Sequence, residues 1–148
     1  MSDRRLIEDS LPLAEISEQS AREKSIRKGH ISTLHLWWAR RPLAACRAAV
    51  YASLVDAPKD DVERQEQHEL ISKLVNWDTL NPAHRDHGVL KQAAANIARC
   101  HRVRHAATAA GDRPRLIDPF SGGGAIPLEA QRLGCETWAN DLNPVAHI

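Results

Sequence analysis

The residues of this chain with the clearest chemical pattern form a glycine loop between two apolar runs. The loop reads Asp118-Pro119-Phe120-Ser121-Gly122-Gly123-Gly124, between Leu116-Ile117 and the run from Ala125 to Ala130. Consecutive glycines allow positive φ and leave backbone N–H groups bare at the start of a helix, where a ligand can approach them closely. The pattern predicts a strand, a loop and a helix that together form a seat for a cofactor.

The spacing within this loop separates the ligands that it could hold. A phosphate-binding P-loop needs Gly-Lys followed by Ser or Thr, whereas Gly124 precedes Ala125-Ile126, so that class is excluded. A dinucleotide fingerprint has the form G-x-G-x-x-G, and Pro127 in place of its third glycine disfavours it. A purely structural tight turn stays open as an alternative, although such a turn needs only one glycine.

An acidic residue after the next predicted strand favours an adenosine-like ligand. Residues 135–140 are expected to form that strand, and Asp141 follows it. In a β-α-β unit, an acid at this place faces the loop across the carboxyl ends of the strands and can accept both hydroxyls of a ribose. The sequence therefore predicts a ligand that carries adenosine and little phosphate.

The elements that position the loop are predicted from hydrophobic periodicity and from Pro and Gly breakers. Helices are expected over 11–28, from Pro42 to about 54, over 56–75 and from Val89 to about Ala110, with a loop from Trp77 to Gly88. Strands are expected at 115–118 and 135–140, with a helix between them that ends at Gly134 and a further helix after an N-cap at Asn143. The fold class is therefore α/β, with a helical N-terminal region over 1–110 and a β-α-β unit within 111–148.

The composition is that of a globular protein, with 43% hydrophobic and 26% charged residues and a formal net charge of +1. Three separated cysteines without C-x-x-C spacing indicate buried thiols in a reducing compartment. The N-terminus lacks the apolar run of a signal peptide, and no stretch approaches the ~18 apolar residues of a membrane span. We therefore expect a cytoplasmic protein. The cysteines are Cys46, Cys100 and Cys135.

A metal site is not expected. Cys100, His101 and His105 lie close together on the predicted helix that precedes the first strand, and histidines at i and i+4 share a helix face. No fourth ligand has a recognisable spacing, however. A basic helix end is the better interpretation, because cationic side chains interact favourably with the negative end of the helix dipole.

A basic segment with two tryptophans precedes the second predicted helix. Residues 22–47 contain seven Lys or Arg against the single acid Glu23, and Trp37-Trp38 stand directly before Ala39-Arg40-Arg41. Basic side chains neutralise phosphates, and an indole offers a stacking surface for an unpaired base. The segment favours nucleic-acid binding by Trp37, Trp38, Arg40 and Arg41. The alternative, in which the tryptophans belong to the core and the arginines are only solvated, stays open.

The glycine loop also carries a family resemblance. With Glu129-Ala130 after it, the loop resembles the S-adenosylmethionine motif of class I methyltransferases, in the form typical of enzymes that methylate exocyclic amino groups of nucleic-acid bases. Asp141-Leu142-Asn143-Pro144 resembles the second motif of these enzymes. The resemblance implies that Asp118 orders the loop or reaches the cofactor's amino group, that Asp141 takes the ribose and that Leu142 packs on the adenine. It also implies that the loop lies against the methionine part, through Phe120, Ser121, Gly122 and Gly124.

The segment from Glu23 to Ala45 resembles the N-terminal domain, of unknown function, of large prokaryotic adenine-specific DNA methylases. The two resemblances together cover residues 11–55 and 115–148. They imply a Rossmann-like methyltransferase sheet, S-adenosylmethionine as cofactor, DNA as partner and adenine N6 as the methyl acceptor. An RNA guanine-N2 methyltransferase is the nearest alternative, because its cofactor loop is similar.

The catalytic motif of amino-methyltransferases, Asp/Asn-Pro-Pro-aromatic, has no counterpart in this chain. Asn81-Pro82-Ala83, Asp118-Pro119-Phe120 and Asn143-Pro144-Val145 each depart from it. No catalytic residue is therefore assigned, and the sheet is expected to be incomplete. A remaining catalytic segment or a partner chain would supply the chemistry, unless the chain is a non-catalytic fragment that binds cofactor, nucleic acid or a protein.

Overall fold

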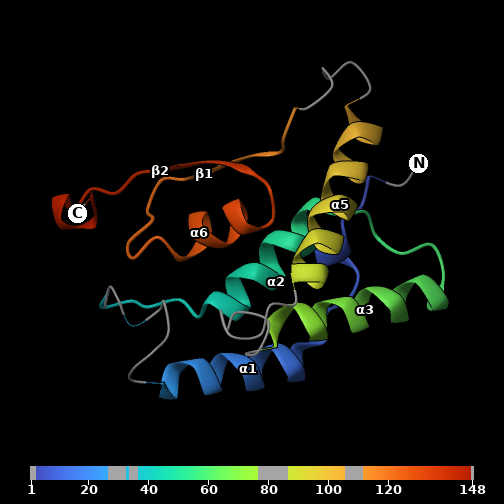
Figure 1. Cartoon of the computed structure of the whole chain (residues 1–148), viewed down its shortest axis with the longest axis horizontal. Helices are drawn as coiled ribbons and strands as arrows, with labels where there is room; N and C mark the ends of the chain where they lie inside the picture. The colour runs from blue at the N-terminus through green and yellow to red at the C-terminus, as the bar shows by residue number, and fades with distance from the viewer. Residues whose placement is uncertain (1–2, 27–32, 34–36, 77–86, 106–111, 148) are drawn as a thin grey trace.

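The computed structural model describes residues 3–26, 33, 37–76, 87–105 and 112–147, and it shows a mixed α/β fold (Figure 1). The α-helices are α1 (Leu13–Ser25), α2 (Leu43–Leu54), α3 (Asp61–Val75), α5 (His87–Arg104) and α6 (Ala125–Arg132). The strands are β1 (Arg115–Asp118) and β2 (Glu136–Ala139), and two short 3₁₀ helices are η1 (Leu6–Glu8) and η3 (Pro144–His147).

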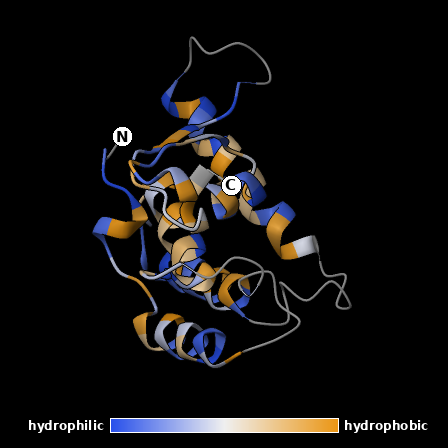
Figure 2. Cartoon of the chain, turned by 90° about the vertical axis from the view of Figure 1, so that its left-hand side faces the viewer, coloured by the Kyte–Doolittle hydropathy of each residue, from blue (hydrophilic) through white to orange (hydrophobic). Residues whose placement is uncertain are grey.

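Helix α2 lies at the centre of the molecule and contacts α1, α3, α5 and α6 (Figure 1). Its sequence explains this place, because small residues allow neighbouring helices to approach closely from several sides. Ala44, Ala48 and Ala52 are all buried. The helices around α2 carry hydrophobic and hydrophilic bands in turn (Figure 2), as expected for helices with one buried face. The small side chains of α2 therefore serve central packing.

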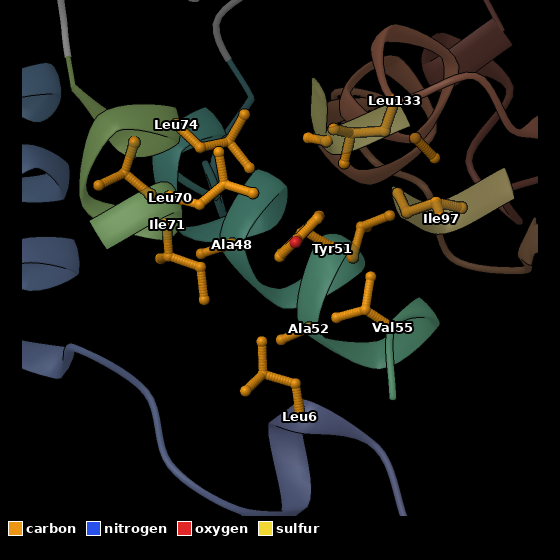
Figure 3. Close-up of a cluster of buried hydrophobic side chains, with 14 of the residues drawn as sticks. Leu6, Ala48, Tyr51, Ala52, Val55, Leu70, Ile71, Leu74, Ile97 and Leu133 are labelled. Atoms are coloured by element: carbon orange, nitrogen blue, oxygen red, sulfur yellow. The ribbon is translucent and has the colours of Figure 1, made fainter. Parts of the chain in front are cut away.

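Tyr51 of α2 lies in the middle of the hydrophobic core (Figure 3). Its hydroxyl donates to Gln67 Oε1 at 2.7 Å and accepts from Asn96 Nδ2 at 3.1 Å, so this buried polar group is satisfied from both α3 and α5. Burial raises the pKa of Tyr51 to about 12. The side chain therefore stays neutral and joins three helices at one point.

Strands β1 and β2 pair in parallel, with Ile117 opposite Trp138 and Asp118 opposite Ala139. Helix α6 connects them and lies between the sheet and α2, so it covers one face of the sheet (Figure 1). Ile117 and Trp138 belong to the other face and are 72% and 47% exposed. The predicted β-α-β unit is thus confirmed as a two-stranded parallel sheet with one face covered by the described elements.

Several predicted boundaries change in the structure. The helix expected over 56–75 begins only at Asp61, because Asp56 forms a β-bridge with Arg5 and Asp60 caps the helix by accepting from Glu63 N at 2.8 Å. Pro42 is the N-cap of α2 and not its first helical residue. The helix expected to end near Ala110 ends at Arg104, and positions 106–111, like 27–28 and 77–86, lie outside the described residues.

The predicted end of the helix at Gly134 and the predicted cap at Asn143 are confirmed, whereas the strand expected over 135–140 is shorter and spans Glu136–Ala139. Gly134 follows α6 with φ of 86°, the left-handed conformation that favours glycine after a helix. Asn143 Oδ1 accepts from Val145 N at 3.0 Å, although the helix it caps is the short η3. Ala130, Leu133 and Cys135 of this unit share one hydrophobic cluster with α2, α3 and α5. The hydrophobic core is therefore continuous across the boundary predicted near residue 110.

Two further expectations concern the whole chain. All three cysteines are buried free thiols, as predicted. Among the helices that the structure describes, none has the length and apolar character needed to span a membrane.

Candidate cofactor site

The glycine loop and the tryptophan–arginine segment form the two walls of one cleft of about 350 Å³. The carboxyl ends of β1 and β2 provide one wall, and the residues that lead into α2 provide the other. Both segments were predicted from the sequence to be functional, but their proximity in space was not predicted. The lining residues are Trp37, Ala39, Arg40, Arg41, Leu43, Asp118, Phe120, Ser121, Gly122, Gly123, Ala125, Ile126 and Asp141.

Gly122 is the point where the two walls meet. Its φ is +50°, and a Cβ added there would lie 2.7 Å from Nε1 and 2.9 Å from Cδ1 of Trp37. Any other residue would therefore be strained in its backbone and would collide with the indole. Gly124, with φ of +72°, is the N-cap of α6. The backbone conformation thus favours glycine at positions 122 and 124, and the contact with Trp37 also requires glycine at position 122.

Two carboxylates hold the loop in place. Asp118 Oδ1 accepts from Phe120 N at 3.1 Å, which agrees with its predicted role in ordering the loop. Asp141 Oδ2 accepts from Gly122 N at 2.8 Å, and Asp141 Oδ1 accepts from Asn143 N at 2.9 Å. The end of β2 is thereby tied to the loop that follows β1. Asp141 also lines the cleft, where its carboxylate presents acceptor oxygens.

The other wall is held by a buried glutamate from α1. Glu23 accepts from Leu43 N at 3.0 Å and from Ala44 N at 3.1 Å, and it therefore caps the N-terminus of α2. Arg40 Nη2 lies 3.7 Å from Glu23 Oε1 and donates to Glu23 O at 3.2 Å. Arg40 is thus tied to the fold by an ion pair, in addition to lining the cleft.

A buried ion pair joins the two walls behind the cleft. Arg47 Nε of α2 donates to Glu129 Oε2 of α6 at 2.5 Å, and both side chains are fully buried. Arg47 Nη1 also donates to Leu74 O at the end of α3, and Arg132 Nη1 donates to Glu129 Oε1 at 2.8 Å. The expectation that the basic residues of 22–47 neutralise phosphates is therefore wrong for Arg47, because its guanidinium has no access to solvent.

The predicted site residues divide into those that line the cleft and those beside it. Asp118, Phe120, Ser121, Gly122 and Asp141 line it, as do Trp37, Arg40 and Arg41. Gly124, Leu142 and Trp38 do not. Leu142 and Trp38 are 85% and 84% exposed, and the Trp38 ring lies 5.0 Å from that of Trp37. Trp38 is therefore not a core residue.

Sequence reasoning missed the supporting roles of Glu23, Arg47 and Glu129. Each had a signal in the sequence. Glu23 is the single acid in a basic segment, Arg47 interrupts an alanine-rich helix, and Glu129 follows the glycine loop. A long charged side chain within an otherwise apolar stretch, such as Arg47, indicates pairing, since burial of an unpaired charge is costly.

Two other kinds of site, a reactive thiol and a metal centre, were considered for the described residues. Burial, followed by the charges of Glu129 and Glu23, raises the pKa of the Cys46 thiol to about 12, so it stays protonated at neutral pH. The rings of His101 and His105 lie 4.7 Å apart. Within the described ranges, no group of three or more His, Cys, Asp or Glu side chains is arranged to hold a metal ion.

The comparison with protein families concerns the wall that contains Trp37 and Arg41. Residues 10–76 match the family described as protein of unknown function (DUF1156). The matched region includes α1, α2 and α3, and with them Glu23 and Arg47. No curated protein and no solved structure matches the chain. The match therefore agrees with the predicted N-terminal domain of unknown function and names no activity.

Proposed function

We propose that this chain provides the S-adenosylmethionine-binding half of a DNA methyltransferase that acts on adenine N6. The observation that carries the proposal is the position of Asp141. Its carboxylate lies at the carboxyl end of β2 and bonds the amide of Gly122 in the loop after β1. An acid and a bare glycine loop across the ends of two parallel strands form the arrangement expected for a nucleoside ligand.

The residues present fit this cofactor. The cleft of about 350 Å³ lies within the ~300–1,000 Å³ usual for small-molecule sites. The Asp141 carboxylate lines the cleft and is of the acceptor type that ribose hydroxyls need, and the positive φ of Gly122 favours glycine, so no side chain projects from this point of the loop. When bound, S-adenosylmethionine supplies an electrophilic methyl group. This chain's own contribution is to orient the cofactor and to shield one side of it from solvent with Trp37.

The remaining chemistry would come from a further segment or partner chain that packs against the sheet. Ile117 and Trp138 leave an apolar patch on the face of the sheet opposite α6. A second apolar groove of about 440 Å³ runs along α2 beside β1 and is lined by Ala45, Ala49 and Leu116, among others. Parallel sheets are normally covered on both faces, so these surfaces support an additional packing element.

Replacement of Asp141 by asparagine tests the cofactor site. Asparagine keeps one acceptor oxygen and loses the charge, so either the loop amide or the ribose loses its partner. We expect the dissociation constant for S-adenosylmethionine to rise about 10- to 100-fold in calorimetry. Asp112→Asn is the matched control, since Asp112 is exposed and precedes the amino end of β1. Equal affinities of wild type and Asp141→Asn would count against the assignment.

The nucleic-acid part of the proposal rests on Trp38. Its indole is 84% exposed next to the cleft wall, as a base-stacking side chain must be. We expect Trp38→Ala to weaken binding of a fluorescent single-stranded DNA with one adenine about tenfold, because stacking contributes ~1–3 kcal/mol per base. Trp138→Ala, which removes another partly exposed indole on the sheet, is the control. A loss of the same size in both variants would contradict a specific role for Trp38.

A further inference from the structure

Arg41 differs in its surroundings from Arg40 and Arg47, the two arginines nearest to it in the sequence. Arg40 is bound to Glu23, and Arg47 is buried against Glu129. Arg41 is exposed and lines the cleft, and the described residues offer it neither a carboxylate nor a carbonyl partner. It also lines the neighbouring apolar groove, so it stands at the border between the two hollows.

Asp118 supplies the opposite charge in the same cleft. Its Oδ1 is bonded to the amide of Phe120, whereas Oδ2 has no donor among the residues that the structure describes. The cleft therefore offers one carboxylate oxygen and one guanidinium to a ligand. A group with an ammonium and a carboxylate on one carbon matches this pair, because each of its charges would meet the opposite one.

We propose that Arg41 binds the α-carboxylate at the amino-acid end of the cofactor, across the cleft from Asp118, for which the family resemblance already implies a contact with the amino group. This inference rests on the proposed function and deepens it, since it selects ligands by their amino-acid part. The region matched by the family of unknown function then has a role as well, because its segment from Trp37 to Arg41 closes the cofactor site. Arg41 thus acts on the cofactor and not on a DNA phosphate.

Two ligands that differ in the amino-acid part test the inference. S-adenosylhomocysteine carries it, and 5′-methylthioadenosine has the same nucleoside without it. For Arg41→Gln, calorimetry should show a 10- to 100-fold weaker affinity for S-adenosylhomocysteine, in the range of hydrogen bonds to charged groups, and an unchanged affinity for 5′-methylthioadenosine. Arg41→Lys should keep part of the affinity because it keeps the charge. Arg99→Gln, an exposed arginine on α5, should change neither.

The outcomes separate this inference from the proposed function. Unchanged affinity of Arg41→Gln for S-adenosylhomocysteine would overturn the inference and leave the cofactor site intact. Equal losses for both ligands would also overturn it, since Arg41 would then act on the nucleoside or on the fold. Failure of the wild-type chain to bind S-adenosylhomocysteine would overturn the proposed function, and this inference with it. A loss of DNA binding alone in Arg41→Gln would assign the residue to phosphate contact instead.

Discussion

Replacement of Arg47 by methionine is expected to lower the free energy of unfolding by about 3–5 kcal/mol, the largest effect of any single substitution argued from this structure. The variant keeps an unbranched side chain, although a shorter one, and leaves the Glu129 carboxylate buried opposite an apolar group. It also removes the donor that reaches the Leu74 carbonyl at the end of α3. Urea unfolding followed by circular dichroism measures the change.

A second substitution distinguishes the loss of an ion pair from a loss of packing. In Arg47→Met/Glu129→Leu both charges are gone, and a buried pair replaced by apolar residues is often neutral in stability. We therefore expect the double variant to regain most of the stability. Arg132→Met serves as the control, because Arg132 is partly exposed and should cost less than about 1 kcal/mol. A double variant as unstable as Arg47→Met would show that lost packing, and not the lost partner of the Glu129 carboxylate, is responsible.

The joint between α2 and α6 also explains which parts of the fold could be predicted. The order strand, loop, helix, strand is determined by local sequence, because the apolar runs, the glycine loop and Gly134 follow one another within one short stretch. The alanine-rich helix was equally predictable, since apolar residues recur at helical spacing after Pro42. These elements depend on neighbours in sequence, and the structure confirms them.

The arrangement of the cleft depends on contacts between distant segments, and a single sequence does not contain them. The approach of Trp37 to Gly122 and the pairing of Arg47 with Glu129 join residues more than 80 positions apart. The basic composition of residues 22–47 suggested one common role for all its arginines. The structure gives them different environments: Arg47 is buried, Arg40 is tied to Glu23, and Arg41 is exposed. Local sequence patterns therefore identified the segments that form the cleft, whereas the role of each side chain depends on its burial in the folded chain.

Glu23 is the other residue whose replacement should have a large effect, because a single carboxylate holds the wall of the cleft that faces the glycine loop. Glutamine has the same size, but it offers one acceptor oxygen where Leu43 N and Ala44 N need two, and its amide hydrogens would face these donors. The charge that stabilises the α2 N-terminus and pairs with Arg40 is lost as well. We expect Glu23→Gln to lower the free energy of unfolding by about 2–3 kcal/mol.

The loss in stability should be accompanied by a loss in ligand affinity, and this combination separates Glu23 from an ordinary core residue. Arg40 and Leu43 line the cleft directly, so a loosened α2 N-terminus displaces the wall that carries Trp37 and Arg41. Calorimetry with S-adenosylhomocysteine, under conditions where the variant is folded, should show weaker binding than the wild type. Glu18→Gln, on an exposed position of α1, should leave both stability and binding unchanged. Unchanged affinity in a folded Glu23→Gln variant would mean that α1 stabilises the fold without positioning the site.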